Sequence, residues 1–140
     1  MRETTQSALD WRRYPNFRPE EFRCRHTGRL RMDPGFMERL QRLRSAYGRS
    51  MVITSGYRDP THPAEAAKTS SGAHTLGRAC DVAVHGRDAL DLVVLAVAHG
   101  FTGIGVQQRG LRRFIHLDDL DATTDRPRPT ASRPGESRAV

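Results

Sequence analysis

The sequence has few cysteines, no long apolar run and no apolar core near its N-terminus. Two cysteines, Cys24 and Cys80, are too few for a framework of disulfides. No stretch approaches the roughly 18 apolar residues of a membrane-spanning helix, so we expect no membrane span. Residues 1–14 are hydrophilic and lack the apolar segment of a secretory signal peptide, so we expect synthesis in the cytoplasm.

Acidic residues are outnumbered by basic ones. The 140 residues include 23 Lys and Arg against 16 Asp and Glu, which gives a formal net charge of +7. Such a balance favours contact with polyanions. However, the sequence shows no helix-turn-helix, no zinc finger and no basic sheet studded with aromatic residues. A solvated basic surface is the ordinary explanation, and we expect no specific binding of nucleic acid.

The composition indicates one small globular domain with polar ends. Apolar residues make up 36% of the chain, whose length suits one domain with a moderate core. Residues 1–16 are predicted to be an N-terminal extension, and residues 17–120 to form the domain. Residues 121–140 are rich in Thr, Arg, Pro and Ser, and have too few apolar side chains to order themselves. We expect the protein to be a monomer.

Two main helices are predicted. The first opens at Asp33, a typical N-cap, and ends at Gly48, and its apolar residues recur at spacings of three and four. The second spans residues 87–99, is more apolar and should pack against a sheet. Its apolar residues at helical spacing are Leu90, Val93, Val94 and Val97.

Short apolar segments predict the strands of that sheet. They cover residues 51–54, 79–84, 101–106 and 113–117, and the last two are joined by a hairpin turn at Arg109-Gly110. The fold class is therefore α+β, with two main helices packed on a small, mostly antiparallel sheet.

The chain is organised around residues 71–81, which read Ser-Gly-Ala-His-Thr-Leu-Gly-Arg-Ala-Cys-Asp. His74 lies in a glycine-containing loop, and Asp81 lies in the strand that follows. A loop folded back over the strand brings the imidazole and the carboxylate together, and both are good zinc ligands. The third candidate ligand is His116, in an apolar run on a strand predicted near that of Asp81.

Three motifs in this order resemble the zinc D-alanyl-D-alanine carboxypeptidase family, which shares its fold with lysostaphin-type endopeptidases and the hedgehog signalling domain. They are Thr-Ser-Gly-Tyr-Arg, Ser-Gly-Ala-His-x-x-Gly-x-Ala-x-Asp and Phe-Ile-His-Leu-Asp, within a similarity that runs from about Phe17 to Asp119. The resemblance implies one zinc ion bound by His74, Asp81 and His116. It also implies that the substrate is a peptidoglycan peptide.

Further site residues come from the first two motifs. Arg58, the arginine of the first motif, is implied to stabilise the developing oxyanion or to hold the substrate carboxylate. Tyr57, beside it, and Ser71, at the start of the second motif, are also assigned to substrate binding. Ser71 additionally suits a hydrogen bond within its own loop.

The general base is the point at which this sequence departs from the family pattern. Many relatives carry a carboxylate three residues before the last histidine ligand, and Arg113 stands there in this chain. Asp118 remains, two residues after His116 and on the same face of the strand. It is predicted to act either as the base or as a support that orients a ligand histidine.

We therefore predict a zinc peptidase that cuts bonds next to D-alanine in peptidoglycan stem peptides, through attack by zinc-bound hydroxide. An alternative is a zinc-stabilised binding module of the same fold without catalysis, which Arg113 in the usual acid's place makes credible. A third is a basic protein that binds nucleic acid or another surface. The motifs leave open a carboxypeptidase or an endopeptidase, and a bacterial or a phage origin. Export or release to reach the cell wall suits an endolysin-like, phage-encoded enzyme.

Overall fold

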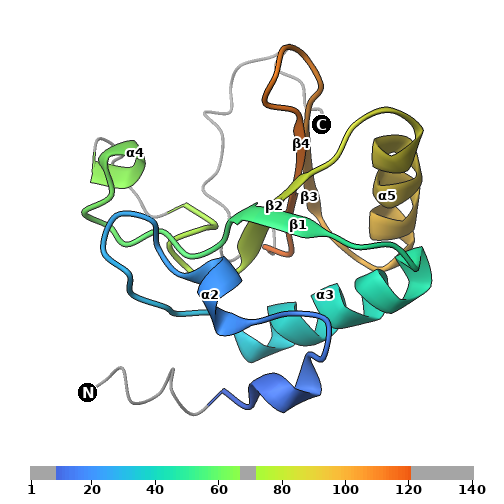
Figure 1. Cartoon of the computed structure of the whole chain (residues 1–140). Coiled ribbons are helices and arrows are strands. Elements are labelled where there is room, and N and C mark those ends of the chain that lie inside the picture. The colour runs from blue at the N-terminus through green and yellow to red at the C-terminus, as the bar shows by residue number, and fades with distance from the viewer. Residues whose placement is uncertain (1–8, 67–71, 121–140) are drawn as a thin grey trace, which may run out of the picture.

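The structure, a computed structural model, describes residues 9–66 and 72–120. These residues form an antiparallel sheet of four strands in the order β1-β2-β4-β3, with helices beside it, which confirms the predicted α+β class (Figure 1). In chain order the elements are the 3-10 helix η1 (Trp11–Arg13), α2 (Pro19–Phe22), α3 (Pro34–Tyr47), β1 (Val52–Ser55), α4 (Pro63–Ala66), β2 (Ala79–Ala83), α5 (Gly86–Ala98), β3 (Gly103–Gln107) and β4 (Phe114–Asp118).

Helix α3 forms as its sequence predicts. The Asp33 carboxylate accepts a hydrogen bond from the backbone N–H of Phe36, and Gly48 ends the helix in the left-handed conformation, with φ 70°. Its apolar stripe is buried in the core and consists of Phe36, Met37, Leu40, Leu43 and Tyr47. The single apolar stripe thus sets which face of α3 is buried, and the two caps set where the helix begins and ends.

Helix α5 packs on β4 of the sheet, as expected, and also on α3, but with a different face from the predicted one. Its buried residues are Ala89, Leu92 and Ala96. Leu90, Val94 and Val97 of the predicted stripe are 58%, 60% and 63% exposed, and only Val93 packs against the core. Both sets have helical spacing, so periodicity alone does not distinguish them. The small alanine side chains allow the helix to approach its neighbours closely.

Aromatic side chains near the N-terminus pack onto the core. The Trp11 ring contacts those of Tyr14 and Phe22, with centroids 5.7 and 5.6 Å apart, and Tyr14 is buried. Residues 9–16, placed in the predicted extension, thus contribute to the same core. Half of that extension, residues 1–8, and the predicted tail, residues 121–140, lie outside the described residues. In the described ranges, no helix has the length and apolar character to cross a membrane.

The two faces of the sheet differ in chemistry. Cys80 and Val82 of β2 and Ile115 and Leu117 of β4 are buried in the core. Because strand side chains alternate, residues between them lie on the opposite face. The register pairs Asp81 directly with His116, whose strands the sequence placed only near each other. Figure 1 shows α4 at one end of the molecule and α5 at the other, with the sheet between them.

Candidate metal centre

Three side chains that the sequence analysis selected converge on one point. Potential ligand atoms of His74, Asp81 and His116 all lie within 4.8 Å of one another. Nε2 of His74 is 3.4 Å, and Nδ1 of His116 is 3.0 Å, from Oδ1 of Asp81. Among the His, Cys, Asp and Glu side chains of residues 9–66 and 72–120, these three form a group close enough to share a metal ion.

The loop before β2 orients the His74 ring. The backbone N–H of Gly77 donates to the His74 carbonyl, and Gly77 adopts φ 72°, a conformation that favours glycine. Nδ1 of His74 lies 2.7 Å from the Gly56 carbonyl, to which it donates its proton. Nε2 is therefore the ring nitrogen that faces Asp81, and it is the nitrogen that a metal ion would use.

Gly56 contributes to the centre through its backbone, and the sequence analysis did not identify this role. A Cβ at residue 56 would lie 2.7 Å from Cα of Phe22, so the close packing of α2 requires glycine there. The same packing places the Gly56 carbonyl against His74. The signal was present in the glycine of the first motif, but its partner lies 18 residues away.

Asp118 contacts the far side of the His116 ring. Its Oδ2 lies 2.7 Å from Nε2 of His116, and its side chain is buried. Its Oδ1 accepts a hydrogen bond from the backbone N–H of Leu120, which helps to hold the carboxylate in place. The two side chains share a face of β4, as expected, and His116 keeps Nδ1 directed at Asp81.

The His116 ring thus lies between two carboxylates. Burial disfavours a charged ring, but the hydrogen bonds to Asp118 and Asp81 outweigh it and raise the pKa of His116 to about 9. Burial also disfavours the Asp81 carboxylate, yet hydrogen bonds from His116 and His74 hold the pKa of Asp81 well below its usual range. Binding of a metal therefore requires His116 to lose a proton.

The metal-free protein is expected to lose stability as the pH rises from about 6.5 towards 9. Folding raises the pKa of His116 from its ordinary value of 6.5, so its contribution to stability is complete below pH 6.5 and lost as the pH passes about 9. Asp81, whose pKa is lowered, stays ionised throughout this window. Thermal melts of chelated protein across this range measure the effect. The fall in melting temperature between pH 6.5 and 9 should be absent from His116→Gln. An equal fall in the variant and the unmodified protein would contradict the prediction.

Arg58 lies at the edge of this group. Its Nη2 is 3.7 Å from Oδ2 of Asp81, and its backbone N–H donates to the His74 carbonyl. The side chain is 24% exposed, so it is reached from solvent while contacting a candidate metal ligand. The structure therefore brings the arginine of the first motif to the second and third motifs.

A carboxylate missed by the sequence analysis lies on the other side of Arg58. Oε2 of Glu65, on α4, is 3.3 Å from Nη1 of Arg58, and the Glu65 side chain is only 3% exposed. The available signal was an acidic residue seven positions after Arg58 in a segment otherwise rich in Pro, Ala and Ser. The sequence alone does not show that this residue contacts Arg58, because the contact depends on how the loop between them folds.

Tyr57 does not lie where its predicted role in substrate binding requires it. Its side chain is 6% exposed and belongs to the hydrophobic core. Its backbone N–H donates to the Phe22 carbonyl, which holds this part of the loop against α2. Ser71 lies outside the described residues. Arg113, at the position of the usual acid, is exposed just before β4.

The residues present fit a divalent metal ion. Two imidazole nitrogens and one carboxylate oxygen are a common three-ligand set, which leaves a fourth tetrahedral position open. The carboxylates of Asp81, Asp118 and Glu65 and the guanidinium of Arg58 together carry a charge of −2 when the histidines are neutral. A divalent cation balances this charge.

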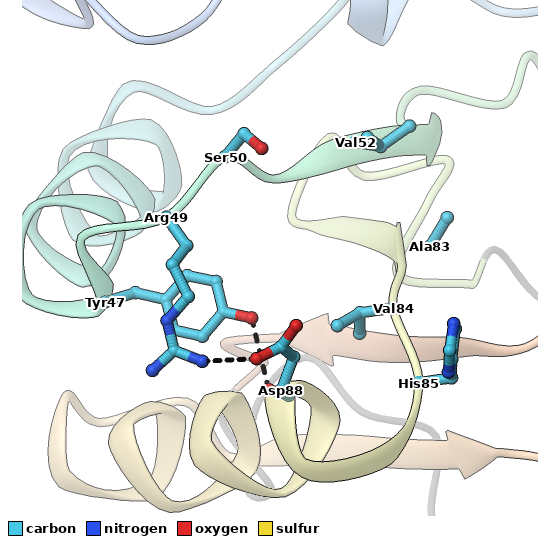
Figure 2. Close-up of a pocket in the computed structure, with 8 residues that line it drawn as sticks. All are labelled: Tyr47, Arg49, Ser50, Val52, Ala83, Val84, His85 and Asp88. Carbon is cyan, nitrogen blue, oxygen red and sulfur yellow. Dashed lines mark hydrogen bonds and ion pairs between the residues drawn. The ribbon is translucent and has the colours of Figure 1, made fainter.

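A surface pocket lies away from these residues (Figure 2). It is lined by the end of α3, the start of β1, the end of β2 and the start of α5. Arg49 stacks over the Tyr47 ring and pairs with Asp88 at 2.7 Å, and Tyr47 Oη donates to the Asp88 carbonyl. These polar groups satisfy one another, so the pocket's contacts join α3 to α5.

Comparison with known proteins agrees with this geometry. A family model described as Peptidase M15 matches residues 15–118, which include all three candidate ligands, Arg58 and Asp118. A comparison with curated proteins finds no match. The match to the family model covers most of the 140 residues. M15 peptidases are metal-dependent, in agreement with the group formed by His74, Asp81 and His116. This chain belongs to the Peptidase M15 family.

Proposed function

We propose that this protein is a zinc peptidase that hydrolyses bonds next to D-alanine in peptidoglycan stem peptides. The observation that carries the proposal is the convergence of His74, Asp81 and His116 within 4.8 Å, in a chain of a peptidase family. Zinc is the metal that best suits two imidazoles, one carboxylate and an open position. Reaching this substrate requires release or export of the protein, as for a phage-encoded lysis enzyme.

Each of the three candidate ligands has a separate role in binding the metal. A bound zinc ion supplies Lewis-acid polarisation of the scissile carbonyl and an activated water at neutral pH. His74 would hold the ion through Nε2, because its Nδ1 donates to Gly56. His116 would hold it through Nδ1, because its Nε2 faces Asp118. Asp81 lies between the two rings and contributes the negative charge.

Arg58 binds negative charge on the substrate. Its guanidinium lies beside Asp81 and is partly exposed, so an approaching peptide meets it next to the metal position. An arginine in that place holds either a substrate carboxylate or the oxyanion that develops on the attacked carbonyl. Both roles require that its charge be aimed at the reacting group.

Of the two roles predicted for Asp118, we assign the supporting one. The 2.7 Å contact to Nε2 of His116 and the burial of Asp118 are typical of a carboxylate that orients a ligand histidine. A base must instead face the substrate side of the metal. The same contact supports the alternative of a zinc-stabilised binding module, because it engages the chain's candidate base.

Asp118→Asn is expected to weaken zinc affinity by about 10–100-fold, with activity partly restored by added zinc. An amide fills the same space but no longer offers the charge that holds the Nε2 proton of His116. Competition with a chromophoric chelator measures the affinity. Asp119→Asn is the matched control, because Asp119 pairs with Arg78 and not with His116. Unchanged affinity together with lost turnover would instead make Asp118 the base.

Digestion of purified muropeptides tests the function as a whole. Zinc-loaded protein should release D-alanine from free stems or separate cross-linked stems, and product masses distinguish the carboxypeptidase from the endopeptidase. Chelated protein should release nothing. Binding of stem peptides without any product, at full zinc occupancy, would favour the binding module. If the protein neither binds stem peptides nor forms any product from them, the proposed substrate is refuted.

A further inference from the structure

Arg58 lies between two carboxylates from different parts of the chain. Its Nη1 is 3.3 Å from Oε2 of Glu65, and its Nη2 is 3.7 Å from Oδ2 of Asp81. One guanidinium therefore joins α4 to β2. Asp81 is a candidate metal ligand, whereas Glu65 lies outside the group that converges on the metal position.

Glu65 is placed by the local structure of α4. Pro63 occupies the first position of this single turn, and the backbone N–H of Glu65 donates to the His62 carbonyl at 2.7 Å. Nδ1 of His62 accepts from the N–H of Ala64 at 2.9 Å. With its start held in this way, α4 directs the Glu65 side chain inward, where it is 3% exposed.

A carboxylate that is so buried needs a close positive partner to offset the loss of hydration. The ion pair of Glu38 with Arg13 differs, because these side chains are 38% and 62% exposed and water screens them. The side chains of Arg58 and Glu65 are less exposed, at 24% and 3%, and Arg58 also contacts Asp81 of the metal group. This pair therefore has a stronger effect on where the arginine lies.

A second anion is needed because Arg58 and a metal ion at Asp81 have charges of the same sign. Two cations near one carboxylate repel each other, and the flexible arginine side chain is the one free to move away. Glu65 lies on the other side of the guanidinium from Asp81. It can therefore hold Arg58 by Nη1 while Nη2 continues to face the metal position.

We propose that Glu65 is a positioning residue, which anchors the Arg58 guanidinium so that its second nitrogen faces the substrate beside the metal. The inference rests on the function proposed above for Arg58. It extends the working site from the three motifs to α4. Glu65 itself does not touch the reacting atoms.

Glu65→Gln tests this role, because glutamine keeps the shape of the side chain and removes its charge. With zinc content unchanged, kcat/KM on a stem peptide should fall about 10–100-fold, as expected for a misplaced catalytic group. In an Arg58→Ala background the same change should cause no further loss, since there is no guanidinium left to position. Glu38→Gln is the matched control and should retain full turnover, because its partner Arg13 has no assigned role in the reaction.

Exchange of the arginine side-chain protons with water gives a readout that needs no substrate. In unmodified zinc-loaded protein, the Nη protons of Arg58 should exchange at least tenfold more slowly than those of Arg13, and Glu65→Gln should remove the difference. If that variant does not fold, the comparison within the unmodified protein still decides. Fast exchange at Arg58 there, or a turnover loss from Glu65→Gln that persists in Arg58→Ala, would overturn the proposal. Slow exchange without any turnover would refute the peptidase function alone.

Discussion

His74→Ala is expected to lower bound zinc from about one ion per chain to less than a tenth, and to reduce turnover below detection. The substitution removes one of three ligands, and two remaining ligands bind zinc far more weakly. Since zinc binds the folded site, the variant should also lose metal-dependent stability, about 4 kcal/mol when free zinc exceeds the dissociation constant a thousandfold. Elemental analysis and thermal melts with and without a chelator measure both effects.

The control for this experiment is another histidine of the same chain. His62→Ala removes a ring that contacts His26 and lies outside the metal group, so zinc content should stay near one ion per chain. Full zinc occupancy in His74→Ala would show that the ligand set is wrong. A variant that lost zinc but kept its chelator-sensitive melting would show the same.

Arg58→Ala is expected to lower kcat/KM by about 10²–10³-fold while zinc content stays near one ion per chain. The guanidinium is assigned to negative charge on the substrate or the oxyanion, and loss of one such group has an effect of this size. Because Nη2 lies 3.7 Å from Asp81 and is not a ligand atom, the metal should remain. Steady-state kinetics with elemental analysis of the same samples provide the measurement.

A control variant and two alternative results show how the Arg58→Ala experiment is interpreted. Arg42→Ala removes an exposed arginine of α3 and should leave both turnover and zinc unchanged. Normal turnover in Arg58→Ala would remove this residue from the site. Loss of zinc would instead make it a structural support of Asp81.

The amino-acid sequence by itself determined the features that depend on local pattern or on rare chemistry. Helix α3 followed from a single apolar stripe between Asp33 and Gly48. The metal group followed because few residue types are good ligands, and three of these stood in ordered motifs. The strands that carry Asp81 and His116 followed from their short apolar runs, and the hairpin turn predicted the pairing of β3 with β4, whereas the direct pairing of β2 with β4 is known only from the structure.

Only the tertiary structure decided which face of α5 is buried and what surrounds the metal group. Helix α5 has apolar residues on two sides, and its core face depends on the close approach of α3 and β4. The contacts of His74 with Gly56 and of Arg58 with Glu65 join side chains and backbone across loops. Such contacts leave no periodic trace in the sequence, because loop geometry and the packing of distant segments determine them.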